Sequence, residues 1–191
     1  ALLALGQVKL RAILASCMVS QLGLSIMGVS LLNGNGYAGA VGNLVVCAVA
    51  GGVLFLSCAS VLAGFGGDEL ERIRGLGRRM PWTFGVMSAA GLTMVGLPPT
   101  AGFHSRNLLL NGVADQGGVS MSICLAVGAL LLGCCFLRIF CIAFLLRPRE
   151  EIRLREYREP GTLRIVPTVL GALAIVCLGF VPDYFMRFIG L

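Results

Sequence analysis

The sequence predicts an all-α transmembrane protein with about five membrane-spanning helices, one of them broken. Hydrophobic residues make up 57% of the 191-residue chain and charged residues only 13%, whereas soluble domains carry about 25% charged residues. The apolar residues form runs of about 20 or more, which is long enough to cross a bilayer as helices. The net charge of +6 comes mainly from residues between these runs, where basic side chains set topology. The composition therefore indicates a bilayer as the surroundings, and no nucleic-acid partner.

We expect one transmembrane domain over residues 1–191, with spans at about 12–32, 38–64, 81–112, 119–146 and 163–182. The connections between them are 33–37, 65–80, 113–118 and 147–162. The first connection contains Asn33-Gly-Asn-Gly36, a composition typical of a turn. The acidic and basic stretches 68–74 and 149–156 are predicted to be short surface helices at most. Small residues are frequent in the spans, and they allow close helix packing in a bilayer.

The third span contains the most informative segment, Val95-Gly-Leu-Pro-Pro-Thr-Ala-Gly-Phe-His-Ser-Arg106. Two prolines within Leu97-Pro98-Pro99 predict a broken helix, because proline lacks the N–H that a helix requires. Irregular backbone at membrane depth is tolerated only where protein or a water-filled cavity receives the freed groups. Arg106 follows the break, and an ionisable residue within a membrane indicates a functional site. The segment therefore predicts ion transfer.

Basic residues are concentrated on one side of the membrane in a five-span topology. The N-terminal segment, the second connection and residues 147–164 hold twelve of the fifteen Lys and Arg residues. They are Lys9, Arg11, Arg72, Arg74, Arg78, Arg79, Arg147, Arg149, Arg153, Arg155, Arg158 and Arg164. The opposite side has only Arg187. The positive-inside rule places the basic connections on the matrix or cytoplasmic side.

The candidate proton-path residues are Arg106, His104, Arg138 and Cys47. Arg106 and Arg138 are the only basic residues deep in the spans, and His104 is the sole histidine. Histidine can relay a proton near neutral pH, whereas arginine stays charged and acts as a fixed charge. His104 and Arg106 are two positions apart, so they point to nearly opposite helix faces. Either arginine could instead extend its head to the interface, and Arg138 could bind a backbone carbonyl.

The cysteines suggest packing rather than metal or redox chemistry. All eight lie in apolar runs and none forms a Cys-x-x-Cys pair; buried free cysteine behaves as a small hydrophobe. The sequence has no phosphate-binding loop, zinc spacing or paired carboxylates. We therefore expect neither a metal nor a cofactor in this chain, and no residue that catalyses redox chemistry.

Four stretches, in order, resemble the antiporter-like subunits of respiratory complex I. Arg11-Ala-Ile-Leu-Ala-Ser-Cys-Met-Val-Ser-Gln-Leu-Gly23 resembles their "KRxLAYSSxSxxG" run. The 68–81 stretch is similar to the loop ending in "GGLxxxMP", and 96–106 resembles the broken helix "GLPxTxxFxxE". Phe136-Leu-Arg138 with Arg147-Pro148 is similar to "YxxR…PR". The stretches follow one another in the family's order over nearly the whole chain. They match the last five helices of a fourteen-helix subunit, which are the C-terminal half of the antiporter-like fold.

The resemblance implies proton translocation through buried ionisable residues and water. It is greatest to subunit 4, as in the "GIYPxxF"-like ending at 179–185, with subunit 5 next; subunit 2 and multisubunit cation/proton antiporters share the core. By position, Cys47 stands where the family has a histidine, Gly51 where some paralogues have a lysine, and Arg106 where a Glu or Lys is expected. A thiol and a glycine cannot carry that relay. Two versions stay open: a weakened, structural channel, or water and His104 acting around a fixed Arg106 charge.

The resemblance also implies the setting of the chain. We expect a membrane-arm subunit of the proton-translocating NADH:ubiquinone oxidoreductase, with the flavin, iron–sulfur and quinone sites in other subunits. The N-terminal half of the fold would come from an upstream segment or another chain, so the sequence is interpreted as a fragment or a split gene product. The mitochondrial inner membrane is expected, with the bacterial plasma membrane as the alternative. A cation/proton antiporter subunit and a structural membrane scaffold are the competing functions.

Overall fold

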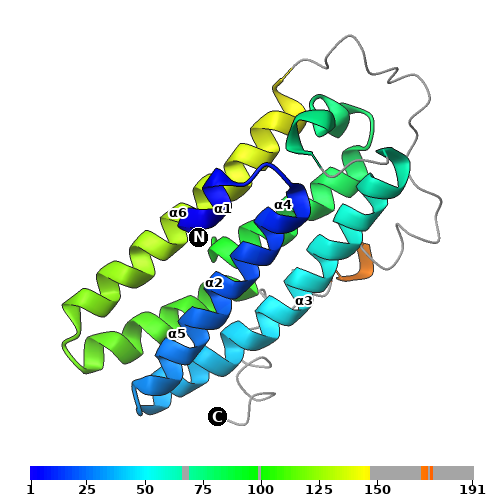
Figure 1. Cartoon of the computed structure of the whole chain (residues 1–191). Coiled ribbons are helices and arrows are strands. Elements are labelled where there is room, and N and C mark those ends of the chain that lie inside the picture. The colour runs from blue at the N-terminus through cyan, green and yellow to red at the C-terminus, as the bar shows by residue number, and fades with distance from the viewer. Residues whose placement is uncertain (66–68, 99, 147–168, 172, 174–191) are drawn as a thin grey trace.

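The computed structural model describes residues 1–65, 69–98, 100–146, 169–171 and 173, and every regular element within them is a helix. The elements are α1 (Leu2–Gly6), α2 (Leu10–Ser30), α3 (Gly34–Phe65), the 3₁₀ turns η1 (Leu70–Ile73) and η2 (Leu76–Arg78), α4 (Pro81–Val95), α5 (Ala101–Asp115) and α6 (Val119–Phe144). Figure 1 shows the long helices lying alongside one another as an elongated bundle. The expected all-α transmembrane class is confirmed.

Three of the described helices are long and apolar enough to cross a membrane: α2, α3 and α6. They coincide with the predicted spans 12–32, 38–64 and 119–146. The predicted span 81–112 is divided into α4 and α5, of 15 residues each, so this helix is broken, as the prolines predict. The predicted span 163–182 lies outside the described residues except for 169–171 and 173, and the predicted surface helix 149–156 lies outside them entirely.

The predicted turn at Asn33–Gly36 is wrong over most of its length, because α3 already begins at Gly34. The side-chain oxygen of Asn33 accepts the backbone N–H of Gly36 at 2.8 Å, which satisfies one of the free donors at the helix start. The Asn33 side chain also donates to the carbonyl of Gly112 in α5 at 2.6 Å. The glycines here serve close helix contact, since a Cβ on Gly112 would lie 2.6 Å from the Gly36 nitrogen.

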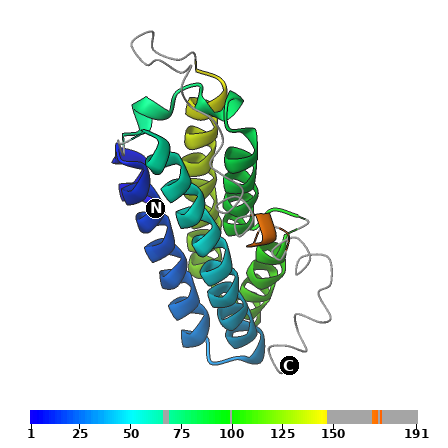
Figure 2. The ribbon, with the colours of Figure 1, turned by 90° about the vertical axis from the view of Figure 1, so that its right-hand side faces the viewer.

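The N-terminal segment and the connection between α3 and α4 meet at one end of the bundle. The N–H of Leu70 donates to the Val8 carbonyl at 2.8 Å, and that of Gly75 to the Ile142 carbonyl of α6 at 3.3 Å. Figure 2 shows these segments gathered at the same end. This matches the predicted grouping of the N-terminal segment with the 65–80 connection, whereas the 147–162 connection lies outside the described residues. The predicted surface helix at 68–74 differs, because Leu70 and Ile73 of η1 are buried and close this end of the core.

The two halves of the broken helix pack on different neighbours. α4 lies between α3 and α6, where Phe84, Met87 and Met94 enter the main core. α5 lies directly against α3: a Cβ on Gly39 of α3 would be 2.7 Å from the backbone nitrogen of Leu109. Such backbone approach is what small residues allow in membranes. The break therefore lies inside the bundle, against α2 and α3.

Candidate functional site

The break between α4 and α5 is produced by one glycine and the prolines that follow it. Gly96 adopts a left-handed conformation with φ of 81°, and its N–H donates to the carbonyls of Leu92 and Thr93 at 3.1 Å each. This arrangement is a common helix C-terminus. In a continuous helix the Met94 carbonyl would accept the N–H four residues later, at Pro98, which has none. The Met94 carbonyl is thereby left free for other donors.

Two side chains donate to that carbonyl inside the bundle. Gln21 of α2 donates through Nε2 at 2.8 Å, and Arg106 of α5 donates through Nη2 at 3.4 Å. Gln21 is 1% exposed and Arg106 is 9% exposed. The Arg106 side chain passes over Gly96, where an added Cβ would lie 3.0 Å from Nε. The break, α2 and α5 thus converge on a single backbone oxygen.

Close approach of the two half-helices fixes the Arg106 position. A Cβ on Gly102, in the first turn of α5, would lie only 1.9 Å from the Thr93 carbonyl oxygen of α4. Ser105, beside Arg106, is fully buried and returns its hydroxyl to the Gly102 carbonyl at 3.1 Å. Any larger residue at 102 would separate α4 from α5 and move the arginine from its acceptor.

A neutral polar cluster continues from Gln21 into α3. Asn43 donates through Nδ2 to the Gln21 carbonyl at 3.1 Å and to the Ser25 hydroxyl at 2.9 Å. The Ser25 hydroxyl lies 3.3 Å from the same Gln21 carbonyl. All three residues are buried. Sequence reasoning missed them because it searched the spans for charges; a glutamine and an asparagine inside apolar runs were the signal.

Two atoms of this region are buried and make no hydrogen bond to any other described residue: Nη1 of Arg106 and Oε1 of Gln21. One is a donor and the other is an acceptor. Buried polar groups nearly always have a partner, whether protein or water. A water molecule can accept from the guanidinium and donate to the amide oxygen, so the pair has the chemistry of a bridged water site.

Two of the three positions that depart from the family pattern, 47 and 51, lie beside methionines rather than in the polar cluster. Cys47 lies one turn after Asn43, and its Sγ is 3.8 Å from Sδ of Met18. At Gly51 an added Cβ would be 2.1 Å from the Met18 methyl and 3.7 Å from the Met94 methyl. Apolar groups therefore fill the space at 51, where a side chain would extend.

His104 and Arg138, the other two predicted proton-path residues, have different surroundings. The His104 ring is half-buried and packs edge-on against Phe103, with ring centroids 5.9 Å apart. Arg138 of α6 donates from Nη1 to the carbonyls of Leu5 at 2.5 Å and Gln7 at 3.2 Å. Arg138 thus binds the C-terminal end of α1, the carbonyl-binding alternative left open above.

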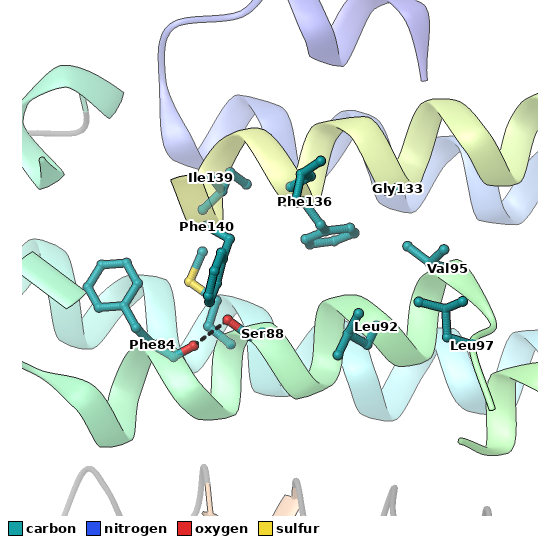
Figure 3. A pocket seen from close by; sticks show the side chains of 11 residues that line it. Phe84, Ser88, Leu92, Val95, Leu97, Gly133, Phe136, Ile139 and Phe140 are labelled. Carbon is teal, nitrogen blue, oxygen red and sulfur yellow. Dashed lines mark hydrogen bonds between the residues drawn. The ribbon is translucent and has the colours of Figure 1, made fainter. Parts of the chain in front are cut away.

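An apolar cavity of about 450 Å³ lies between α4 and α6. Figure 3 shows Phe136 and Phe140 of α6 facing Leu92 and Val95 of α4 across it. Ser88 contributes the one hydroxyl of the lining, and that hydroxyl donates to the Phe84 carbonyl at 2.8 Å. The cavity therefore offers no free polar group and is not part of the polar site. Among the described residues no group of three or more His, Cys, Asp or Glu could hold a metal ion.

Comparison with known proteins points to the same family that the broken-helix segment resembles. Residues 1–133 match the family model described as NADH:quinone oxidoreductase/Mrp antiporter, TM. NADH-quinone oxidoreductase subunit N of Thiobacillus denitrificans is 29% identical over 188 residues, which are 96% of this chain and 37% of that protein. NADH-ubiquinone oxidoreductase chain 5 of Talaromyces marneffei is 26% identical, over 94% of this chain and 28% of that protein.

A solved structure extends the similarity to three dimensions. A chain of respiratory complex I from Thermus thermophilus with bound NADH superposes with a TM-score of 0.81 and 26% identity, over 97% of this chain and 38% of that chain. The present sequence thus spans less than half the length of the relatives it matches. With the broken helix, the buried arginine and the family match over 133 residues together, the chain belongs to the NADH:quinone oxidoreductase/Mrp antiporter transmembrane family.

Proposed function

We propose that this chain forms the second half of an antiporter-like proton-translocation module in the membrane arm of a proton-pumping NADH:quinone oxidoreductase. The observation that carries the proposal is the buried Arg106, held at the break of α4 and α5 by the Met94 carbonyl. A permanent charge at membrane depth is costly. The break in the helix frees the Met94 carbonyl that binds this charge. A charge retained at this depth with a dedicated acceptor indicates a function in ion movement.

In this proposal Arg106 acts as a fixed charge and does not carry the proton itself. Its free Nη1 and the free Oε1 of Gln21 would be joined by water, which both accepts and donates hydrogen bonds. Protons would then pass along water beside the cation, and the cation would set the energy of a proton at that point. The version in which water surrounds a fixed Arg106 is therefore favoured over a purely structural half. His104, half-buried on the same helix, remains the candidate that accepts and releases protons.

The polar route in this half would run through α2 and α3 by way of Gln21, Asn43 and Ser25. Their hydrogen bonds connect the broken helix to both spans. Positions 47 and 51 would not take part, because Met18 occupies the space at Gly51. The route is neutral apart from Arg106, so its conduction would depend on water contacts rather than on a chain of ionisable side chains.

The test is the proton-to-electron stoichiometry of the purified complex in sealed vesicles, with Arg106→Ala in this chain. We expect normal assembly and electron transfer with fewer protons moved per electron pair. Gln21→Leu, which removes the amide oxygen, should have the same direction of effect. Arg138→Gln is the matched control, because it changes an arginine in a span whose hydrogen bonds go to the carbonyls of Leu5 and Gln7, away from the break. Unchanged stoichiometry in assembled Arg106→Ala complex would reject the proposal.

The whole-protein setting is also part of this proposal. The partners would be other membrane-arm subunits, together with an upstream segment or chain that supplies the N-terminal half. We place the complex in the mitochondrial inner membrane, with a bacterial plasma membrane as the alternative, and its basic connections on the matrix or cytoplasmic side. The redox centres would lie in other subunits, leaving this chain without a cofactor. Subunit 4 is the paralogue that the sequence motifs favour, and subunit 5 is next.

A multisubunit cation/proton antiporter is the competing function, because the same family includes those proteins. Such a subunit would need an acidic ligand for the cation within the membrane, and no Asp or Glu lies in α2, α3, α4 or α6. Co-purification separates the functions. NADH:quinone activity in the isolated complex supports the proposal, sodium-dependent proton flux supports the antiporter, and neither activity supports a structural scaffold.

A further inference from the structure

The apolar cavity between α4 and α6 is too large to remain empty. It measures about 450 Å³, whereas protein interiors hold few voids larger than a water molecule, and an unfilled cavity costs stability in proportion to its volume. Ordered water does not suit it, because a buried water needs about two to four polar partners and the Ser88 hydroxyl is already bonded to the Phe84 carbonyl. The occupant must therefore be apolar.

The cavity opens on the outer surface of the bundle, between large apolar side chains. Leu92 and Leu97 on one side of the opening, with Leu137 and Phe140 of α6 on the other, are between 40% and 61% exposed. The outer surface of a membrane-spanning bundle faces a bilayer core that contains no water. A hydrocarbon chain can therefore enter the cavity directly from the bilayer.

The two helices that form the walls touch each other, so the cavity is narrow. A Cβ added to Gly91 of α4 would lie 2.6 Å from the Phe136 ring of α6. A Cβ added to Gly133 of α6 would lie 3.8 Å from a methyl of Val95. A helix with its side chains is about 10–12 Å wide and cannot pass between walls this close. A single hydrocarbon chain can, so the width favours a lipid over a helix of another subunit.

The length of the cavity and the residues at its ends also match a lipid. The lining extends from Phe84 to Leu97, which is up to about 20 Å of helix, and Figure 3 shows these two residues at opposite ends. Trp82, two residues before Phe84, is 68% exposed, and tryptophan is enriched at the membrane interface. Arg79 is exposed just before α4 and can bind a phosphate. A cation and an interfacial ring thus lie at one end, and the helix break lies at the other.

We propose that the cavity between α4 and α6 binds one acyl chain of a membrane phospholipid, whose phosphate lies beside Arg79 and Trp82. The end of the chain reaches Val95 and Leu97, so the lipid packs against the break and supports α4 where its hydrogen bonds end. The proposal requires only that this chain spans a bilayer. A negative result would therefore leave the proposed role of Arg106 unchanged, and the reverse also holds.

The test uses the whole complex in nanodiscs that contain phosphatidylglycerol with a diazirine in one acyl chain. Light converts the diazirine into a carbene that labels the residues in contact, and mass spectrometry of the digested protein locates the labels. Phe136 and Val95 line the cavity and are only partly exposed. They should carry more label than Val127 and Leu130 of α6, which are 50% and 66% exposed but do not line it.

Three variants complete the test. Gly133→Leu places a side chain in the cavity and should remove most of the Phe136 label. Gly128→Leu is the matched control on α6, since nothing lies within 4 Å of its added Cβ, and it should leave the label unchanged. Arg79→Gln removes the charge at the headgroup end and should lower the Phe136 label.

The comparison within the wild-type protein is decisive even if Gly133→Leu does not assemble. The proposal is overturned if Phe136 and Val95 carry no more label than Val127 and Leu130, which is the result expected for lipid in general contact or for a partner's side chain filling the cavity. An unchanged Phe136 label in assembled Gly133→Leu complex would also overturn it. An unchanged label in Arg79→Gln would refute the headgroup position.

Discussion

Replacing Gly102 by alanine tests whether the contact between the two half-helices positions the site. The added Cβ would lie 1.9 Å from the Thr93 carbonyl oxygen and 3.0 Å from its carbon. These are backbone atoms of α4, so no side-chain rotation can relieve the overlap. An ordinary contact needs about 3.5 Å, so α4 and α5 must separate by more than an ångström at the break.

The expected cost follows from that displacement. Overpacking a well-packed core by one methyl group destabilises by about 1–3 kcal/mol, and the rigid partner here places Gly102→Ala at about 3 kcal/mol. The matched control is Gly85→Ala in α4, where nothing lies within 4 Å of the added Cβ. There alanine gains about 0.5–1 kcal/mol, because glycine is a poor helix former.

The assay is thermal loss of this chain from the purified complex, followed in parallel for the two variants. Gly102→Ala should lower the midpoint temperature, and Gly85→Ala should keep or raise it. Gly102→Ala should also reduce proton-to-electron stoichiometry in the fraction that assembles, since Arg106 moves away from the Met94 carbonyl. Equal midpoints for the two variants would refute the reasoning that this contact fixes the break.

Three further substitutions test other parts of the structure. Arg138→Ala removes two charge-assisted hydrogen bonds to α1, each worth about 1.5–3 kcal/mol, and should increase hydrogen exchange in α1 alone. Gly51→Lys should lower the yield of assembled complex, because Met18 fills the space that the lysine would need. Adding Met18→Ala should restore the yield. Gly52→Ala is the control and should not lower the yield, because nothing lies within 4 Å of the added Cβ. Asn43→Leu removes two buried hydrogen bonds and should cost about 2 kcal/mol, measured as a lower midpoint of thermal release.

The break was predictable from sequence because its cause is local. Proline at 98 lacks an N–H wherever it stands, so a helix through it must lose a hydrogen bond. Burial of Arg106 was predictable for a similar reason, since an arginine amid apolar residues must lie in the membrane or distort it. The start of α3 was less predictable. A glycine-rich stretch is typical of a turn, but the Asn33 side chain caps a helix that begins at Gly34.

The partners of Arg106 depend on packing between elements far apart in the sequence. Gln21 and Asn43 come from α2 and α3, and nothing in their own segments shows that they face the break. The contact of Met18 with Gly51 was equally unpredictable. A glycine at 51 suggests open space beside α3, but Met18 of α2 fills that space. The position of Arg138 was clear from the pattern, but its two acceptors are Leu5 of α1 and Gln7, which follows α1, and this five-residue helix has no sequence signal of its own.

The broken helix also explains how a cation is accepted without a carboxylate in α2, α3, α4 or α6. Met94 belongs to the last turn of α4, where the helix dipole gives the free carbonyl groups a partial negative charge. Arg106 donates to that carbonyl, so backbone geometry supplies part of the counter-charge. A carboxylate could be neutralised by protonation, whereas a carbonyl dipole persists at every pH. The arginine is therefore held by a charge distribution that proton transfer cannot remove, which suits the fixed-charge role proposed for Arg106.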